Sequence, residues 1–127
     1  MSSLPALAQA FPSKPVRFVL PSVAGGALDA SARRIATPLG SALGQSIIVE
    51  NKPGGIGLIA AQEVAKAAPD GYTLLIGTIN DVLREFTPNA QHAWNRGFTP
   101  VTRPSRHQSI SCCGVAVSSR WHISFWN

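Results

Sequence analysis

Three loops in this sequence carry residue types that can hold a small anion. Residues 22–29 (SVAGGALD) and 51–57 (NKPGGIG) are rich in glycine, and residues 77–81 (GTIND) offer hydroxyl and amide side chains. Glycine lets the backbone approach a ligand closely, and amide N–H groups at the start of a helix favour negative charge. A carboxylate or a phosphate at residues 24–26 is therefore chemically sensible. The competing interpretation is that the glycines only form tight corners, and spacing alone slightly favours it.

Catalytic and cofactor motifs do not emerge from the sequence. The six acidic residues do not pair at helical spacing near a base, and there is no G-x-S-x-G nucleophile motif. The three histidines lack metal-ligand spacing to the adjacent Cys112 and Cys113. The phosphate-loop pattern G-x-x-x-x-G-K-[ST] is missing, and AGGALD does not reproduce G-x-G-x-x-G. We expect no metal, no cofactor and no enzyme activity, and a small α/β enzyme is the least favoured alternative.

Alternating strands and helices must position the three loops. Short apolar runs predict buried strands at residues 16–21 and 46–50, and a third strand at residues 72–77. Residues 29–43 and 56–68 between them have helical periodicity. Strand–helix–strand–helix–strand with short loops predicts a parallel sheet with right-handed crossovers. The predicted fold class is therefore α/β, as a partial doubly wound parallel sheet (βαβαβ).

Each predicted helix has an apolar face toward the core. These faces consist of Ala32, Ile35, Ala36, Leu39 and Leu43 in the first helix, and of Ile56, Ile59, Ala60, Val64 and Ala67 in the second. Asp29 suits the first turn of the first helix, where a carboxylate meets the positive end of the helix dipole. Taken alone, Asp29 is more readily a cap than a ligand partner. Gly44 ends this helix, and Pro38 inside it should cost about 3 kcal/mol or force a kink.

Composition narrows the class of function. A chain of 127 residues is long enough for one domain with a core but not for two ordinary lobes. The formal net charge of +5 comes from scattered Lys and Arg rather than a basic stripe, so we expect no nucleic-acid binding. No apolar run approaches the ~20 residues that cross a bilayer, so we expect no direct membrane insertion. Ala8-Gln9-Ala10 has the small-x-small pattern of a signal-peptidase site, which makes Phe11 the expected mature start.

Several motifs in order resemble one family. The segment FPSKP at residues 11–15 is followed by P-x-x-A-G-G-x-x-D at residues 21–29 and by E-N-K-P-G at residues 50–54. VAKAAPDGYTLL follows at residues 64–75 and FTPVT at residues 98–102. Together they resemble the Bug-type solute-binding receptors of tripartite tricarboxylate transporters. The resemblance covers about residues 11–103, and the ordered set is far more specific than any single motif.

The resemblance implies a periplasmic receptor that closes two lobes around a small organic di- or tricarboxylate and hands it to membrane transporter subunits. This sequence would then be the N-terminal part of one lobe of a type II periplasmic binding protein. Residue by residue, the resemblance assigns ligand binding to Ala24, Gly25, Gly26 and Asp29, with Thr78 after the third strand. It thereby overturns the slight preference for purely structural glycines. Two departures are that Leu28 replaces a common Ser or Thr, and that Ile56, Leu58 and Ala60 replace two glycines and an amide.

The resemblance also divides the chain. Residues 1–10 are the expected remnant of a secretory signal peptide, and residues 11–103 the N-terminal part of the first lobe. Residues 104–127 carry no family pattern, and their Ser, Arg, Cys, Trp and His content suggests a shifted reading frame. We therefore expect a truncated chain with an incomplete cleft, whose three-stranded sheet would leave edges exposed. The alternative function is a non-functional remnant of such a receptor.

Overall fold

The predicted order of strands and helices is confirmed in the computed structural model, which describes residues 11–78, 98–102 and 113–115. The elements are β1 (Val16–Leu20), α1 (Ala27–Leu43), β2 (Ile47–Asn51), the 3₁₀ turn η1 (Gly55–Gly57), α2 (Leu58–Lys66), β3 (Thr73–Ile76), β4 (Thr99–Thr102) and β5 (Cys113–Val115). The expected leader at residues 1–10 lies outside the described residues, as does most of the segment 104–127. Among the described residues, no helix combines the length and apolar character that a bilayer crossing requires.

The strands form one sheet in the order β2-β1-β3-β5-β4. β1 is central to the parallel part, because it pairs in parallel with β2 on one side and with β3 on the other. β5 then pairs antiparallel with both β3 and β4. The parallel βαβαβ unit is therefore as predicted, but the expectation of only three strands was wrong. The fourth and fifth strands escaped sequence analysis because neither TPVT nor CGV is a continuous apolar run or a regular alternation of apolar and polar residues.

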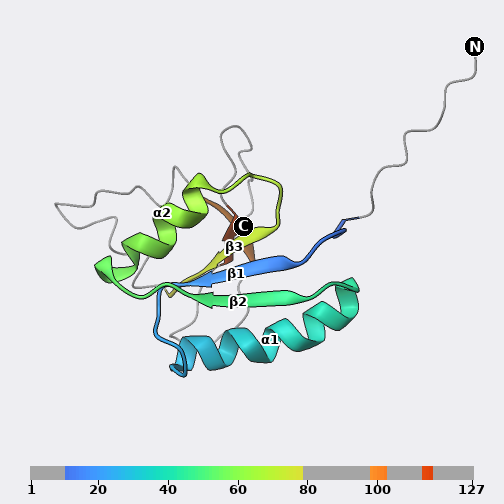
Figure 1. The fold of residues 1–127 in the computed structure, drawn as a ribbon, viewed down its shortest axis with the longest axis horizontal. Coiled ribbons are helices and arrows are strands. Elements are labelled where there is room, and N and C mark those ends of the chain that lie inside the picture. The colour runs from blue at the N-terminus through green and yellow to red at the C-terminus, as the bar shows by residue number, and fades with distance from the viewer. Residues whose placement is uncertain (1–10, 79–97, 103–112, 116–127) are drawn as a thin grey trace, which may run out of the picture.

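The two helices cover opposite faces of the sheet (Figure 1). Successive side chains of a strand point to opposite faces. On one face, Phe18 and Leu20 of β1 join a cluster with Leu28, Ala32 and Ala36 of α1. On the other face, Val19 packs with Leu75 of β3 and with Ala60, Ala61 and Val64 of α2. This two-sided covering makes the unit doubly wound.

Helix α1 follows its predicted apolar face at Ala32, Ala36 and Leu39, whereas Ile35 and Leu43 are half-buried and lie outside the core cluster. Ala32 and Ala36 are buried, Leu28 joins them, and the larger Leu39 packs half-buried against the same cluster. Asp29 lies in the first turn, and Gly44 ends the helix in the left-handed conformation with φ +67°. The helix runs as one element from Ala27 to Leu43 with Pro38 inside it.

Helix α2 contains one wrong prediction. Ile59 was expected in the core, but it is 49% exposed, and Ala61 is fully buried instead. The reason is the 3₁₀ turn η1 before the helix, which delays the first α-helical residue to Leu58 and turns Ala60, Ala61 and Val64 toward the sheet. Ile59 lies over the preceding glycines instead, since a Cβ atom on Gly54 would come within 3.0 Å of its Cδ1 atom. The side chain of Ile56 lies outside the description.

Strand β2 was predicted to be buried, and it is an edge strand. Ile47 and Val49 pack half-buried on the α1 side, whereas Ile48 on the other side is 44% exposed. An apolar run alone does not reveal where a strand lies in a sheet, because sheet order depends on contacts distant in sequence.

A cluster of charged side chains attaches α2 to the exposed end of β2. The Arg17 guanidinium donates to both carboxylate oxygens of Glu50, at 2.9 and 2.6 Å, and to Glu63 at 2.9 Å. Lys52 Nζ lies 3.3 Å from the other oxygen of Glu63. The Arg17 contact lowers the pKa of Glu50, which keeps that carboxylate charged. This cluster links β1 to β2 through Glu50 and to α2 through Glu63.

Candidate ligand-binding site

All five predicted ligand-binding residues lie at the edge of the sheet that is formed by the carboxyl ends of its parallel strands. Residues 24–26 form the loop between β1 and α1, Asp29 begins α1, and Thr78 follows β3 by two residues. Because β1 and β3 are adjacent and parallel, their carboxyl ends open on the same edge (Figure 1). Ligands of open α/β sheets bind at this edge.

The loop after β2 reaches the same edge. The N–H of Lys52 donates a hydrogen bond of 2.8 Å to the carbonyl oxygen of Leu20, the last residue of β1. Leu20 also pairs in register with Asn51, the last residue of β2. The Gly-rich loops that follow β1 and β2 therefore begin side by side.

The backbone of residues 24–26 presents an open approach to the start of α1. Gly25 has φ +83°, a conformation that favours glycine, and a Cβ atom there would meet nothing within 4 Å. Gly26 is the N-cap, in extended conformation and without a side-chain cap. Helix geometry leaves the N–H groups of the first turn without an intrahelical acceptor, and the helix dipole makes this end positive. The loop can therefore receive an anionic group.

Asp29 is buried, and its carboxylate contacts the backbone of this loop. It is 4% exposed, and its Oδ2 atom accepts a hydrogen bond of 2.9 Å from the N–H of Gly25. Nε of Arg33 donates to the same carboxylate, at 3.1 Å to Oδ1 and 3.0 Å to Oδ2. The Arg33 hydrogen bond, followed by that of Gly25, lowers the pKa of Asp29 to about 2. A charged side chain at the third helical position that reaches back to the backbone before the helix acts as a cap.

Of the two interpretations of Asp29, this geometry supports the cap. Direct contact with a ligand stays a prediction for Asp29, as it does for residues 24–26. Thr78 is half-buried at the carboxyl end of β3 and also stays a predicted ligand contact.

Three residues of this edge were missed by the sequence analysis. Arg33 binds Asp29 and also places Nη2 3.5 Å from Oδ1 of Asn51. The Nδ2 atom of Asn51 and the Oγ atom of Ser22 are buried without a well-formed hydrogen bond to any residue in the part of the chain that the structure describes. Arg33 could have been found, because a base four residues after an acid lies on the same side of a helix. Nothing local marks Asn51 or Ser22.

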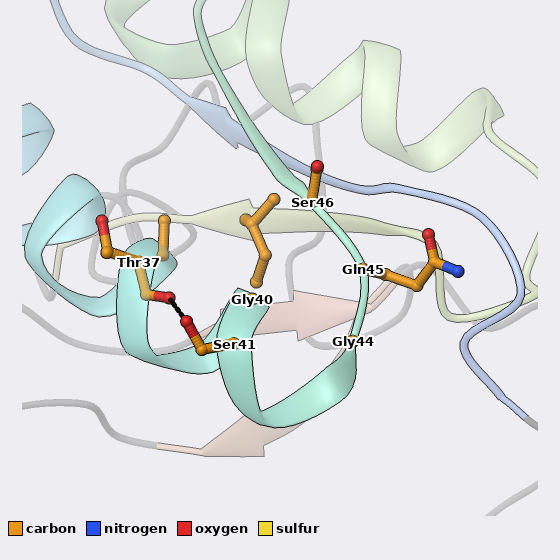
Figure 2. Close-up of a pocket in the computed structure, with 8 residues that line it drawn as sticks. Thr37, Gly40, Ser41, Gly44, Gln45 and Ser46 are labelled. Atoms are coloured by element: carbon orange, nitrogen blue, oxygen red, sulfur yellow. Dashed lines mark hydrogen bonds between the residues drawn. The ribbon is translucent and has the colours of Figure 1, made fainter.

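A hollow lies away from this edge, between the end of α1 and the start of β2 (Figure 2). Its volume is about 520 Å³, and Thr37, Gly40, Ser41 and Ile47 are among the residues that line it. The hydroxyls of Thr37 and Ser41 are engaged with helix carbonyls four residues earlier. None of the predicted ligand-binding residues lines this hollow. The part of the chain that the structure describes contains no cluster of three potential metal ligands.

Comparison with known proteins identifies the family. The sequence profile described as "Tripartite tricarboxylate transporter family receptor" matches residues 31–108, more than half of the chain. The chain belongs to this receptor family. The match confirms the resemblance seen in the motifs, and the fold agrees with that of the periplasmic binding protein BugD, at a TM-score of 0.65 and 35% identity over 72% of this chain and 31% of BugD.

Individual relatives support the same assignment. A UPF0065 protein from the tcbD-tcbE intergenic region of Pseudomonas sp. strain P51 is 42% identical over 102 residues, which are 80% of this chain and 30% of that protein. MatC from Rhodopseudomonas palustris with bound malate has a TM-score of 0.66 and 39% identity, over 72% of this chain and 32% of MatC. An R. palustris protein with adipate has a TM-score of 0.65 and 39% identity, over 72% of this chain and 31% of that protein. The chain thus spans about 30% of the length of the relatives it matches.

Proposed function

We propose that the loop at residues 24–26 and the start of α1 bind one carboxylate group of a small organic di- or tricarboxylic acid. The protein would act in the periplasm as the receptor of a tripartite tricarboxylate transporter and pass its ligand to the membrane subunits. The other carboxylate and the body of the acid would be held by parts of a receptor beyond those described. The role is binding, without chemistry on the ligand.

The observation that carries this proposal is the glycine-lined start of a 17-residue helix at the ligand edge of the sheet, where the N-cap Gly26 has no capping side chain and Asp29 caps the preceding N–H of Gly25. Anions bind at such helix starts because backbone N–H groups point at them and the dipole favours negative charge. The Asp29 carboxylate satisfies Gly25 from beneath the loop, so the loop is held in its open shape without a side chain blocking its outer surface. Malate and adipate, the acids named with two solved relatives, are both dicarboxylates.

A thermal-shift series with isothermal titration calorimetry tests the proposal. Malate, adipate and citrate are added to the full chain, with adipamide as a neutral match for adipate. A ligand that binds only the folded state raises the melting temperature as its concentration exceeds the dissociation constant. We expect at least one acid to do so and adipamide to have no effect. Absence of a shift with every acid, in a chain that unfolds cooperatively, would favour the alternative of a non-functional remnant.

A further inference from the structure

The geometry of Arg33 points to a role in holding the two Gly-rich loops in place. We infer that Arg33 is a positioning residue that fixes the loop at residues 24–26 and the loop at residues 52–54 relative to each other. This inference rests on the proposed function, because the two loops border the proposed carboxylate site. Arg33 itself is not assigned a contact with the ligand.

The first arm of Arg33 acts through Asp29. Nε lies within 3.1 Å of both carboxylate oxygens, and Asp29 in turn accepts the N–H of Gly25. The Asp29 side chain is 6% exposed whereas the Arg33 side chain is 54% exposed, so the guanidinium covers the buried carboxylate from the solvent side. Removal of the guanidinium would leave a buried carboxylate whose remaining partners are neutral, the N–H of Gly25 and the side chain of Asn51. Such a group is costly to keep charged, so the orientation of Asp29 and the shape of the loop depend on Arg33.

The second arm reaches the other loop. Nη2 of the same guanidinium lies 3.5 Å from Oδ1 of Asn51, at the outer limit of a hydrogen bond. Asn51 is the last residue of β2, and Lys52, which opens the second loop, is bonded to the end of β1. The planar guanidinium has donors that point in fixed, divergent directions, so one side chain can serve Asp29 and Asn51 together. A lysine ammonium at the same position is a single point charge and cannot hold both.

The polar groups nearby agree with a junction whose geometry must be held. Nδ2 of Asn51 and Oγ of Ser22, near the beginning of each loop, are both buried without a well-formed hydrogen bond to another described residue, although the Asn51 side chain lies close enough to Asp29 to help lower its pKa. Unpaired buried polar atoms do not hold themselves in one orientation, whereas the Arg33 contact orients the Asn51 amide through its oxygen. The Arg33 side chain therefore acts at a place where local packing alone does not fix the conformation of the two loops.

The test compares Arg33→Gln with Arg34→Gln, which removes the same charge from the next, exposed position of α1. Amide hydrogen exchange is measured at residues 24–26 and at Lys52 and Gly54 of the second loop, because Pro53 has no N–H. The dissociation constants for malate and adipate are measured in parallel. We expect Arg33→Gln to speed exchange in both loops about ten-fold and to weaken acid binding by a similar factor, with changes of less than about two-fold in Arg34→Gln. Arg33→Lys should keep most protection at residues 24–26 and lose it at residues 52–54.

Two outcomes would overturn the inference. One is faster exchange at residues 24–26 alone in Arg33→Gln, with residues 52–54 unchanged. The other is unchanged acid affinity in a variant whose loops are both loosened, which would leave the proposed function intact. If no acid binds the wild-type chain, the proposed function fails, while the exchange measurement still decides whether Arg33 couples the loops. Should Arg33→Gln not fold, Asn51→Ala removes the second arm while Arg33 and Gly25 still hold Asp29, and it should speed exchange at Lys52 and Gly54 more than at Gly25.

Discussion

The hydroxyl oxygen of Tyr72 accepts a hydrogen bond of 2.8 Å from the backbone N–H of Ser13, 59 residues earlier in the chain. The Ser13 hydroxyl lies 3.2 Å from the same oxygen. Lys14 Nζ is 4.4 Å from the centroid of the Tyr72 ring and 3.0 Å from Oδ2 of Asp70. The ring of Phe11 also packs against the ring of Tyr72, with centroids 4.9 Å apart. These contacts fasten the segment before β1 to the turn before β3.

This attachment predicts an unusual titration of Tyr72. The Ser13 side chain, and next its backbone N–H, lower the pKa of the Tyr72 hydroxyl below its ordinary value of 10.0, because donors stabilise the phenolate. Tyr72 is the only tyrosine, so absorbance at the phenolate band reports it alone. We expect a midpoint below the ordinary value in the wild type and a shift back toward it in Ser13→Ala. An identical midpoint in the two proteins would show that the Ser13 side chain does not act on the hydroxyl in solution, since Ser13→Ala keeps the backbone N–H donor.

Core packing predicts a contrast between two apolar residues. Leu75 is 1% exposed between β1 and α2, whereas Ile48 on the edge strand is 44% exposed. Leu75→Ala should lower the free energy of unfolding by about 2–5 kcal/mol because it leaves a cavity. Ile48→Ala should change it by no more than about 0.5 kcal/mol, as is usual at a surface. Urea unfolding of both variants measures the difference, and comparable losses would contradict the edge position of β2.

The same two residues show what sequence could and could not predict. The elements from β1 to β3 were predictable because apolar runs and helical periods are local, and the turn at residues 69–71 is marked by its own residues. The edge position of Ile48 was not, because the run at residues 47–49 is equally apolar whether a strand is central or outermost. Ile59 was misplaced because a 3₁₀ turn of three residues rotated the helix that follows it.

The candidate site was predictable to a similar depth. The glycines and Asp29 stand in one motif, so their meeting at the start of α1 follows from the chain itself. The contact of Arg33 with Asn51 joins residues 18 positions apart, and it depends on how α1 packs on β2. Such contacts are set by tertiary packing, which no local pattern contains. The family resemblance likewise named the site without revealing that Asp29 faces inward.

The two glycines with positive φ that flank α1 predict that one substitution should change stability alone and the other should change both stability and ligand binding. Gly25 has φ +83° and Gly44 has φ +67°, and a Cβ atom at either would meet nothing within 4 Å. An alanine at each position would therefore cost roughly 1–2 kcal/mol of conformational strain without a clash. We expect similar losses of stability in Gly25→Ala and Gly44→Ala by urea unfolding. Only Gly25→Ala should also weaken malate or adipate binding, and equal affinities would move the ligand away from the loop at residues 24–26.

The lowered pKa of Asp29 predicts how the stability of the fold falls in acid. Its pKa is held at about 2 by Arg33 and then by Gly25, below the ordinary value of 3.8. A carboxyl whose folded-state pKa is depressed contributes stability that is fully present above its ordinary pKa and is lost as the pH falls toward the folded value. The contribution of Asp29 should therefore disappear between about pH 4 and pH 2. The stability difference between wild type and Asp29→Asn should be largest near neutral pH and shrink through this window.

Urea unfolding at a series of pH values measures that difference. The wild type should lose further stability in acid because Glu50 and Asp70 also have lowered pKa values, so the comparison rests on the difference between the two proteins. Asp70→Asn serves as the matched control, since Asp70 is bonded to Tyr72 N–H and Lys14 at the exposed opposite end of the sheet. Its variant should also lose less stability in acid than the wild type, but it should leave the exchange protection of Gly25 unchanged. A difference between wild type and Asp29→Asn that stayed constant from about pH 6 to pH 2 would show that Asp29 is not held charged by Arg33.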